Sequence, residues 1–142
     1  MLRERELERV PPSRENADYL MAQARRNLES AISDCEHNPA LAYAALYDAG
    51  RLALTVVLEN QGLRPTTKGG HVAPYEAVMA QLHPPAGPKL RPYDRMRRAR
   101  HRAECPDFSG PGVTTGSVRD DLPAAEVIVE ICTSVLDEMS PF

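Results

Sequence analysis

The segment from about residue 40 to residue 60 is apolar on most of its circumference when it is drawn as an α-helix. Asn38 is suited to cap this helix, Pro39 to occupy its first position, and Gly62 to follow its end. Its apolar residues form two stripes, one of Leu41, Ala45, Leu52 and Val56 and one of Ala42, Leu46, Ala49, Ala53 and Val57. A helix with so little polar surface needs neighbours on most sides, which predicts a bundle built around it.

Four other segments repeat apolar residues at steps of three and four. They cover residues 13–35 with Ser13 as the cap, about 71–82, about 91–104, and 125 onward. Loops rich in glycine and proline separate them, and no segment is typical of a strand. We therefore predict an all-α fold, a four-to-five-helix up-and-down bundle. Residues 1–12 are expected to be a charged N-terminal lead-in, and residues 13–142 a single domain.

The start of the last helix has two readings. Ser117 and Asp120 match a capping box with Asp in place of Glu, which would begin a helix there. Pro123 would interrupt such a helix. Either the helix starts after Asp121, or it kinks.

The cysteines and the N-terminus bear on location. Cys35, Cys105 and Cys132 are odd in number and far apart, without the spacing of metal ligands or of a disulfide framework. We find no apolar run near the roughly 18 residues that span a bilayer, and residues 1–9 are charged. We expect a cytoplasmic protein with no membrane contact, no metal and no cofactor.

Basic residues are concentrated in one part of a chain whose net charge is only -3. One acid, Asp94, accompanies seven basic residues, which are Lys89, Arg91, Arg95, Arg97, Arg98, Arg100 and Arg102. Such a run is either a solvated helix face or the footprint of a polyanion. No aromatic side chain interleaves with the outer arginines, so a stacking platform for single-stranded nucleic acid is not indicated.

The 100° turn per residue of an α-helix separates this basic segment into faces. With Tyr93 at zero, Met96, Ala99 and Ala103 fall between about 240° and 300°. Arg100 falls at about 340°, inside this apolar sector. Glu104 falls at about 20°, and the other arginines of the helix and His101 fall between about 40° and 200°. These are Arg95, Arg97, Arg98, His101 and Arg102. Arg100 is thus the arginine predicted to point toward the core or an interface.

A guanidinium keeps its proton, so an inward-facing Arg100 needs an anion or a dimer cleft. Asp48, a charge within the first apolar stripe of the central helix, is the expected structural partner. The pair has two readings. It is either a structural ion pair that fixes helix register, or part of a cleft in which Arg100 is functional.

The sequence resembles the HEPN family in three pieces that follow in the expected order. They are residues 42–49 (Ala-Tyr-Ala-Ala-Leu-Tyr-Asp-Ala), Gly70-His71, and residues 97–105 (Arg-Arg-Ala-Arg-His-Arg-Ala-Glu-Cys). With the bundle layout they cover roughly residues 14–139. Members of this family are helical bundles that usually dimerise, and the active ones are metal-independent ribonucleases. Many belong to toxin–antitoxin or defence modules, often beside a nucleotidyltransferase.

The family motif is an arginine, a polar residue, and a histidine after four to six intervening positions. In one alignment Arg100 is the arginine and His101 the polar residue, and Cys105 stands where histidine is expected. In the other, Arg95 and His101 are the arginine and the histidine, but Met96 replaces the polar residue. If RNA is cleaved, a 2′-hydroxyl would attack the adjacent phosphate, with His101 moving the proton and Arg100 stabilising the phosphorane charge.

The resemblance implies a dimeric protein of a toxin–antitoxin or defence module with a degenerate ribonuclease motif. It would bind RNA, a nucleotidyltransferase-type partner protein, or both, and the residues expected to do so are Arg95, Arg97, Arg98 and Arg102. The alternative is an active, metal-independent endoribonuclease toxin, with Arg100 and His101 as its catalytic residues. A third reading is a helical protein with a purely structural role.

Overall fold

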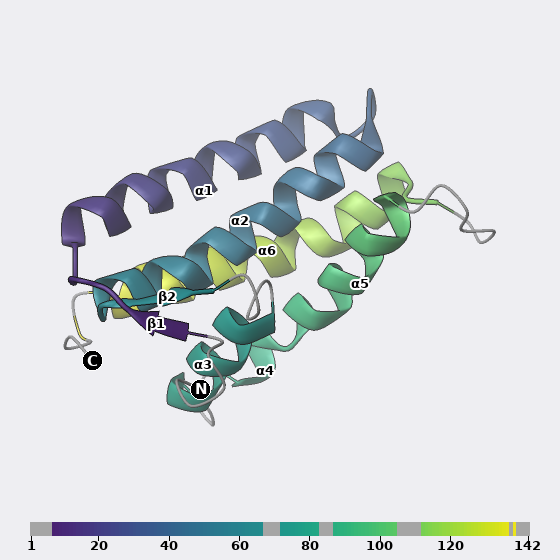
Figure 1. The fold of residues 1–142 in the computed structure, drawn as a ribbon. Coiled ribbons are helices and arrows are strands. Elements are labelled where there is room, and N and C mark those ends of the chain that lie inside the picture. Colours follow the sequence, from purple (N-terminus) through teal and green to yellow (C-terminus); the bar gives the residue numbers. More distant parts are fainter. Residues whose placement is uncertain (1–6, 67–71, 83–86, 105–111, 137, 139–142) are drawn as a thin grey trace.

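The computed structural model describes residues 7–66, 72–82, 87–104, 112–136 and 138. Its helices are α1 (Arg14–Asp34), α2 (Pro39–Asn60), α3 (Val72–Leu82), α4 (Gly87–Leu90), α5 (Pro92–Glu104) and α6 (Thr115–Val135) (Figure 1). The described part of the chain is mostly helical, which confirms the all-α prediction. The short α4 lies between the predicted helices 71–82 and 91–104, where we expected only a loop.

Helix α2 is the centre of the fold. It packs against α1 on one side, α6 on another, and α3 and α5 on the third (Figure 1). Leu46, Leu54 and Leu58 are completely buried along its length. The prediction of a central helix is confirmed, because the apolar surface on most of its circumference is covered by these four neighbours.

By length and composition α2 could also cross a membrane, contrary to our expectation that no segment would. The apolar window has a mean hydropathy of 1.4, and 61% of it is buried inside the fold. The central helix of a bundle has the same property, so this feature does not by itself indicate a membrane.

The first two helices begin at the residues that their caps predict. The Ser13 side chain accepts a hydrogen bond from the backbone N–H of Asn16, and the Asn38 side chain accepts one from Leu41. Pro39 follows Asn38 at the start of α2. These caps satisfy backbone donors that have no partner within the helix.

Helix α6 begins earlier than either reading of the sequence allowed. Thr114 is its cap, with its side chain accepting from the backbone N–H of Ser117 and the Ser117 hydroxyl accepting from Thr114 in return. The capping box therefore lies three residues before the one we predicted at Ser117. The helix continues through Pro123, whose side chain is exposed, and a start after Asp121 is wrong.

The prediction that the chain has no strand is wrong. β1 (Leu7–Arg9) pairs antiparallel with β2 (Leu63–Pro65), and the Val10 backbone N–H donates to the carbonyl of Gly62 at 2.8 Å. Gly62 has φ +82°, and a Cβ there would lie 2.8 Å from the Val10 carbonyl oxygen. Residues 7–10, expected to be a lead-in, are therefore part of the folded unit.

Candidate functional site

Two buried side chains place the basic helix α5 against the bundle. Tyr93 and Met96 are buried, as the angular analysis predicts. The Tyr93 ring stacks between Tyr47 of α2 and Tyr75 of α3, with centroid distances of 5.2 and 5.4 Å. The hydroxyls of Tyr47 and Tyr93 share a hydrogen bond of 2.8 Å. Helices α2, α3 and α5 thus meet in one aromatic stack.

Arg100 lies at the edge of this stack and points toward α2. Its side chain is 23% exposed, and its Cζ lies 5.5 Å from the centre of the Tyr47 ring. Its Nε lies 3.9 Å from Oδ1 of Asp48, which is within ion-pair range but beyond hydrogen-bond length. The structure thus brings together the two residues that the sequence analysis paired.

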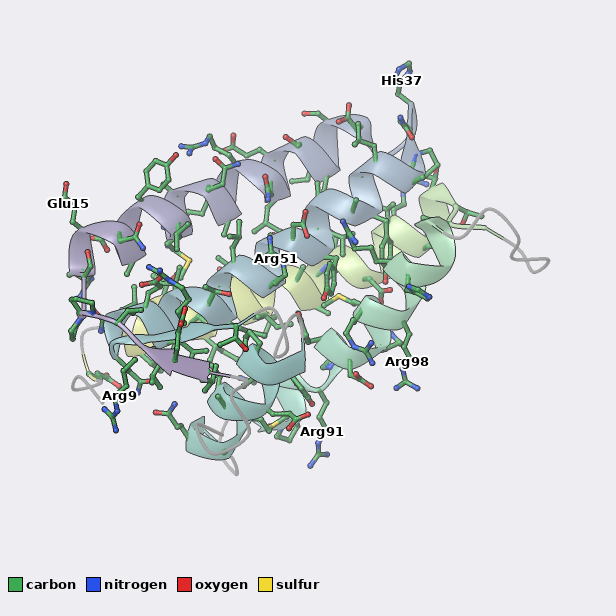
Figure 2. All side chains as sticks on the ribbon, viewed as in Figure 1. Arg9, Glu15, His37, Arg51, Arg91 and Arg98 are labelled. Atoms are coloured by element: carbon green, nitrogen blue, oxygen red, sulfur yellow. The ribbon has the colours of Figure 1, made fainter. Side chains whose placement is uncertain are left out.

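Asp48 also forms an ion pair with a second arginine, Arg51, which we did not predict from the sequence. The Nε of Arg51 lies 3.5 Å from the same Oδ1 atom. Figure 2 labels Arg51 on α2. Its position three residues after Asp48 on one helix was the signal that could have revealed it. The side chains of Arg51 and Asp48 are 32% and 30% exposed.

The guanidinium of Arg97 also adds to the positive electrostatic potential near Tyr47. Burial raises the pKa of Tyr47. The hydrogen bond with Tyr93 and the charges of Arg51, Arg100 and Arg97 oppose that rise. Burial likewise raises the pKa of Tyr93. The phenols are therefore neutral at physiological pH, and three cations lie within electrostatic range of one hydroxyl. We call Arg51, Asp48 and Arg100 the α2–α5 cluster.

The outer arginines share a different carboxylate. Asp94 accepts hydrogen bonds from Arg97 at 3.0 and 3.2 Å and from Arg98 at 2.6 Å. The bond from Arg97 is the main reason that the pKa of Asp94 is lowered. Arg98 extends away from the bundle (Figure 2) and its side chain is 66% exposed. Arg98 is thus the most accessible of the predicted binding arginines whose side chains the structure describes.

Arg95, also predicted to bind a ligand, is engaged with another helix. It donates to Oδ1 of Asp121 on α6, and Oδ2 of Asp121 accepts a 2.7 Å hydrogen bond from the Tyr43 hydroxyl on α2. Nothing in the local sequence pattern marks Asp121, because its partners are distant in the chain. Arg95 therefore joins α5 to α6 and is less available to a ligand.

His101, the second predicted catalytic residue, is not brought into the α2–α5 cluster. His101 is exposed on α5, on a different side of the helix from Arg100. Arg102 belongs to α5, but its side chain lies outside the described residues. Gly70-His71 and Cys105, which carry parts of the family resemblance, also lie outside them.

Comparison with family models, with curated proteins and with solved structures finds no match for this chain. Within the described ranges, no group of three or more His, Cys, Asp or Glu side chains could hold a metal ion. The chemistry that the α2–α5 cluster offers is electrostatic. It presents half-buried guanidinium groups that can donate hydrogen bonds to an anion.

Proposed function

We propose that the protein is a HEPN-like dimer of a toxin–antitoxin or defence module, and that it binds RNA with a degenerate ribonuclease motif. The observation that carries this proposal is the position of Arg100, half-buried against the Tyr47 ring and beside Asp48. An arginine held in this way has lost much of its rotational freedom before a ligand arrives. Its planar donors then suit a phosphate better than a freely moving side chain would.

Accessible arginines on the same helix support binding of an extended polyanion. Arg98 is highly exposed, and Arg97 is half-exposed. Phosphate groups repeated along a strand can contact several such cations at once, and each contact releases counterions. The function therefore predicts RNA binding that weakens steeply with salt. A nucleotidyltransferase-type partner protein is the second expected ligand of the module.

The test is a binding titration of single-stranded RNA at several salt concentrations, with Arg100→Gln compared with Arg14→Gln. Arg14 is an exposed arginine on α1 that pairs with Asp18, so its variant matches the charge change. We expect Arg100→Gln to lower affinity about tenfold, and the control to change it less than about twofold. Equal effects of the two variants would contradict a special role for Arg100. Analytical ultracentrifugation of the protein without RNA measures its oligomeric state, and we expect a dimer.

The exposed His101 directly after Arg100 favours a second candidate, an active endoribonuclease. Incubating RNA with the protein in the presence of a chelator tests it, because general acid–base cleavage through a 2′-hydroxyl needs no metal. Cleavage that Arg100→Gln and His101→Ala both abolish would establish the enzyme. RNA binding without cleavage would support the degenerate motif. A monomer that binds no RNA at low salt would leave only the structural reading.

A further inference from the structure

We propose that Arg51 and Arg100 form a clamp for one phosphate group of RNA, and that Asp48 is the counterion that this phosphate displaces. The inference rests on the proposed function for the identity of the ligand. It adds a second binding residue from another helix, outside the motif that the sequence resemblance identified. It also gives Asp48 a role in regulating access to that site.

The first argument is the loose geometry around Asp48. Both guanidinium contacts to its Oδ1 are long, 3.5 Å from Arg51 and 3.9 Å from Arg100. Hydrogen bonds between charged groups are normally near 2.8 Å, as in the 2.6 Å contact between Arg98 and Asp94. Asp48 therefore holds the two cations near each other without binding either closely. Little interaction energy is lost when another anion takes its place.

The second argument is that the two cations come from different helices of a rigid frame. Arg51 projects from α2 and Arg100 from α5, and the stack of Tyr47 and Tyr93 joins those helices. A ligand therefore meets two donors whose backbones are already positioned, which lowers the entropic cost of binding. Partial burial also places both charges in a medium less polar than water, where attraction for an anion is stronger.

The third argument concerns the chemical class of the anion. A carboxylate is already present at the cluster and makes only long contacts there. A phosphodiester offers two non-bridging oxygens around a larger tetrahedral centre, so one oxygen can face each guanidinium. Arg91 and Arg98 point away from the bundle (Figure 2), and exposed cations of this kind favour a ligand with repeated charges. These features favour a nucleic acid strand over an acidic side chain.

The decisive experiment measures binding of a short single-stranded RNA to Arg51→Gln and Asp48→Asn. We expect Arg51→Gln to weaken binding about tenfold, as Arg100→Gln does, because each removes one guanidinium of the clamp. We expect Asp48→Asn to strengthen binding about tenfold, because it removes the competing charge. Opposite effects of two neighbouring side chains on one helix cannot arise from misfolding.

Arg14→Gln and Asp18→Asn are the matched controls, since they make the same charge changes in an exposed pair on α1. Both should change affinity less than about twofold, as distant surface charges are screened by salt. If Asp18→Asn strengthens binding as much as Asp48→Asn, the effect is general electrostatics and the clamp is wrong. Unchanged affinity in Arg51→Gln would also overturn it. Competition by polyglutamate as strong as by RNA would overturn the phosphate assignment.

Inorganic pyrophosphate separates this inference from the proposed function. If pyrophosphate raises the Tm of the wild type but not that of Arg51→Gln, the result supports the clamp, even when no RNA binds. In that case the proposed RNA function is wrong and the clamp is not. RNA binding that is insensitive to Arg51→Gln would leave the function standing and remove the clamp.

Discussion

Two carboxylates join α5 to the rest of the bundle, and they do so in opposite ways. Asp121 on α6 is 14% exposed and accepts hydrogen bonds from both Tyr43 and Arg95. Asp48 on α2 is 30% exposed and lies at long distances from Arg51 and Arg100. The first carboxylate is satisfied by close donors from two helices. The second is near two cations but bound closely by neither in the contacts described above.

This difference gives the two carboxylates different roles in the fold. A mostly buried carboxylate must be hydrogen-bonded to be tolerated, so the Asp121 contacts help to hold α5 in place beside the buried Tyr93 and Met96. A loosely paired carboxylate contributes little to stability, but it keeps two guanidinium groups close together at the surface. The same helix is therefore held by close contacts at one carboxylate and by long contacts at the other.

Asp121→Asn should have the largest effect on stability. Removing the charge weakens the bonds from Arg95 and Tyr43, and we expect a loss of about 2 kcal/mol in the free energy of unfolding. Urea denaturation followed by circular dichroism measures it. RNA affinity of the folded variant should be unchanged. A loss no larger than that of Asp48→Asn would remove the distinction between the two carboxylates.

Tyr93→Phe should come next, because it removes the hydrogen bond between the buried hydroxyls of Tyr47 and Tyr93. We expect a loss of about 1 kcal/mol at neutral pH. The raised pKa of Tyr93 means that this residue stabilises the fold fully below about pH 10, the ordinary tyrosine value, and less above it. The difference between wild type and variant should therefore narrow above about pH 10. Denaturation at several alkaline pH values checks this, and a constant difference would contradict it.

Asp94→Asn should have a smaller effect, about 0.5 kcal/mol at neutral pH, because its partner Arg97 is partly exposed and its partner Arg98 is largely exposed. The pKa of Asp94 is lowered, chiefly by the bond from Arg97. Its stabilisation is therefore complete above about pH 4, the ordinary carboxyl value, and is lost as the pH falls further. Thermal unfolding should show the variant and wild type converging in acid. A difference that persists there would assign the effect to something other than this ionisation.

Asp48→Asn should have the smallest effect on stability, less than about 0.5 kcal/mol. Its contacts are too long for strong bonds, although its expected effect on RNA affinity is among the largest. Urea denaturation of this variant beside Asp121→Asn completes the comparison. A loss near 2 kcal/mol would make Asp48 a structural anchor like Asp121.

The parts of the fold set by local rules were predictable from sequence. The caps Ser13 and Asn38 and the apolar spacing placed α1 and α2 close to their observed bounds. Simple rotation of 100° per residue placed Tyr93 and Met96 on the buried side of α5 and turned Arg100 toward it. Asp48 was a useful candidate because a charge within an apolar stripe needs a partner that offsets the cost of its burial.

The remaining features depend on pairings between distant segments. No local pattern joins Arg95 to Asp121 or brings Tyr75 beside Tyr93, because these contacts require the packing of whole helices. The β1–β2 pair was missed because three-residue strands carry almost no periodic signal. Arg51 was predictable, because its spacing of three residues from Asp48 on one helix indicates an ion pair.

The stack of Tyr47, Tyr75 and Tyr93 also makes the protein optically informative. The chain contains no tryptophan and only five tyrosines, so these three residues account for most of its near-ultraviolet chromophores. Arg100 lies over one of the three rings. A guanidinium that leaves Tyr47 to meet a ligand would alter the absorbance and circular dichroism of the native protein directly, without any attached dye.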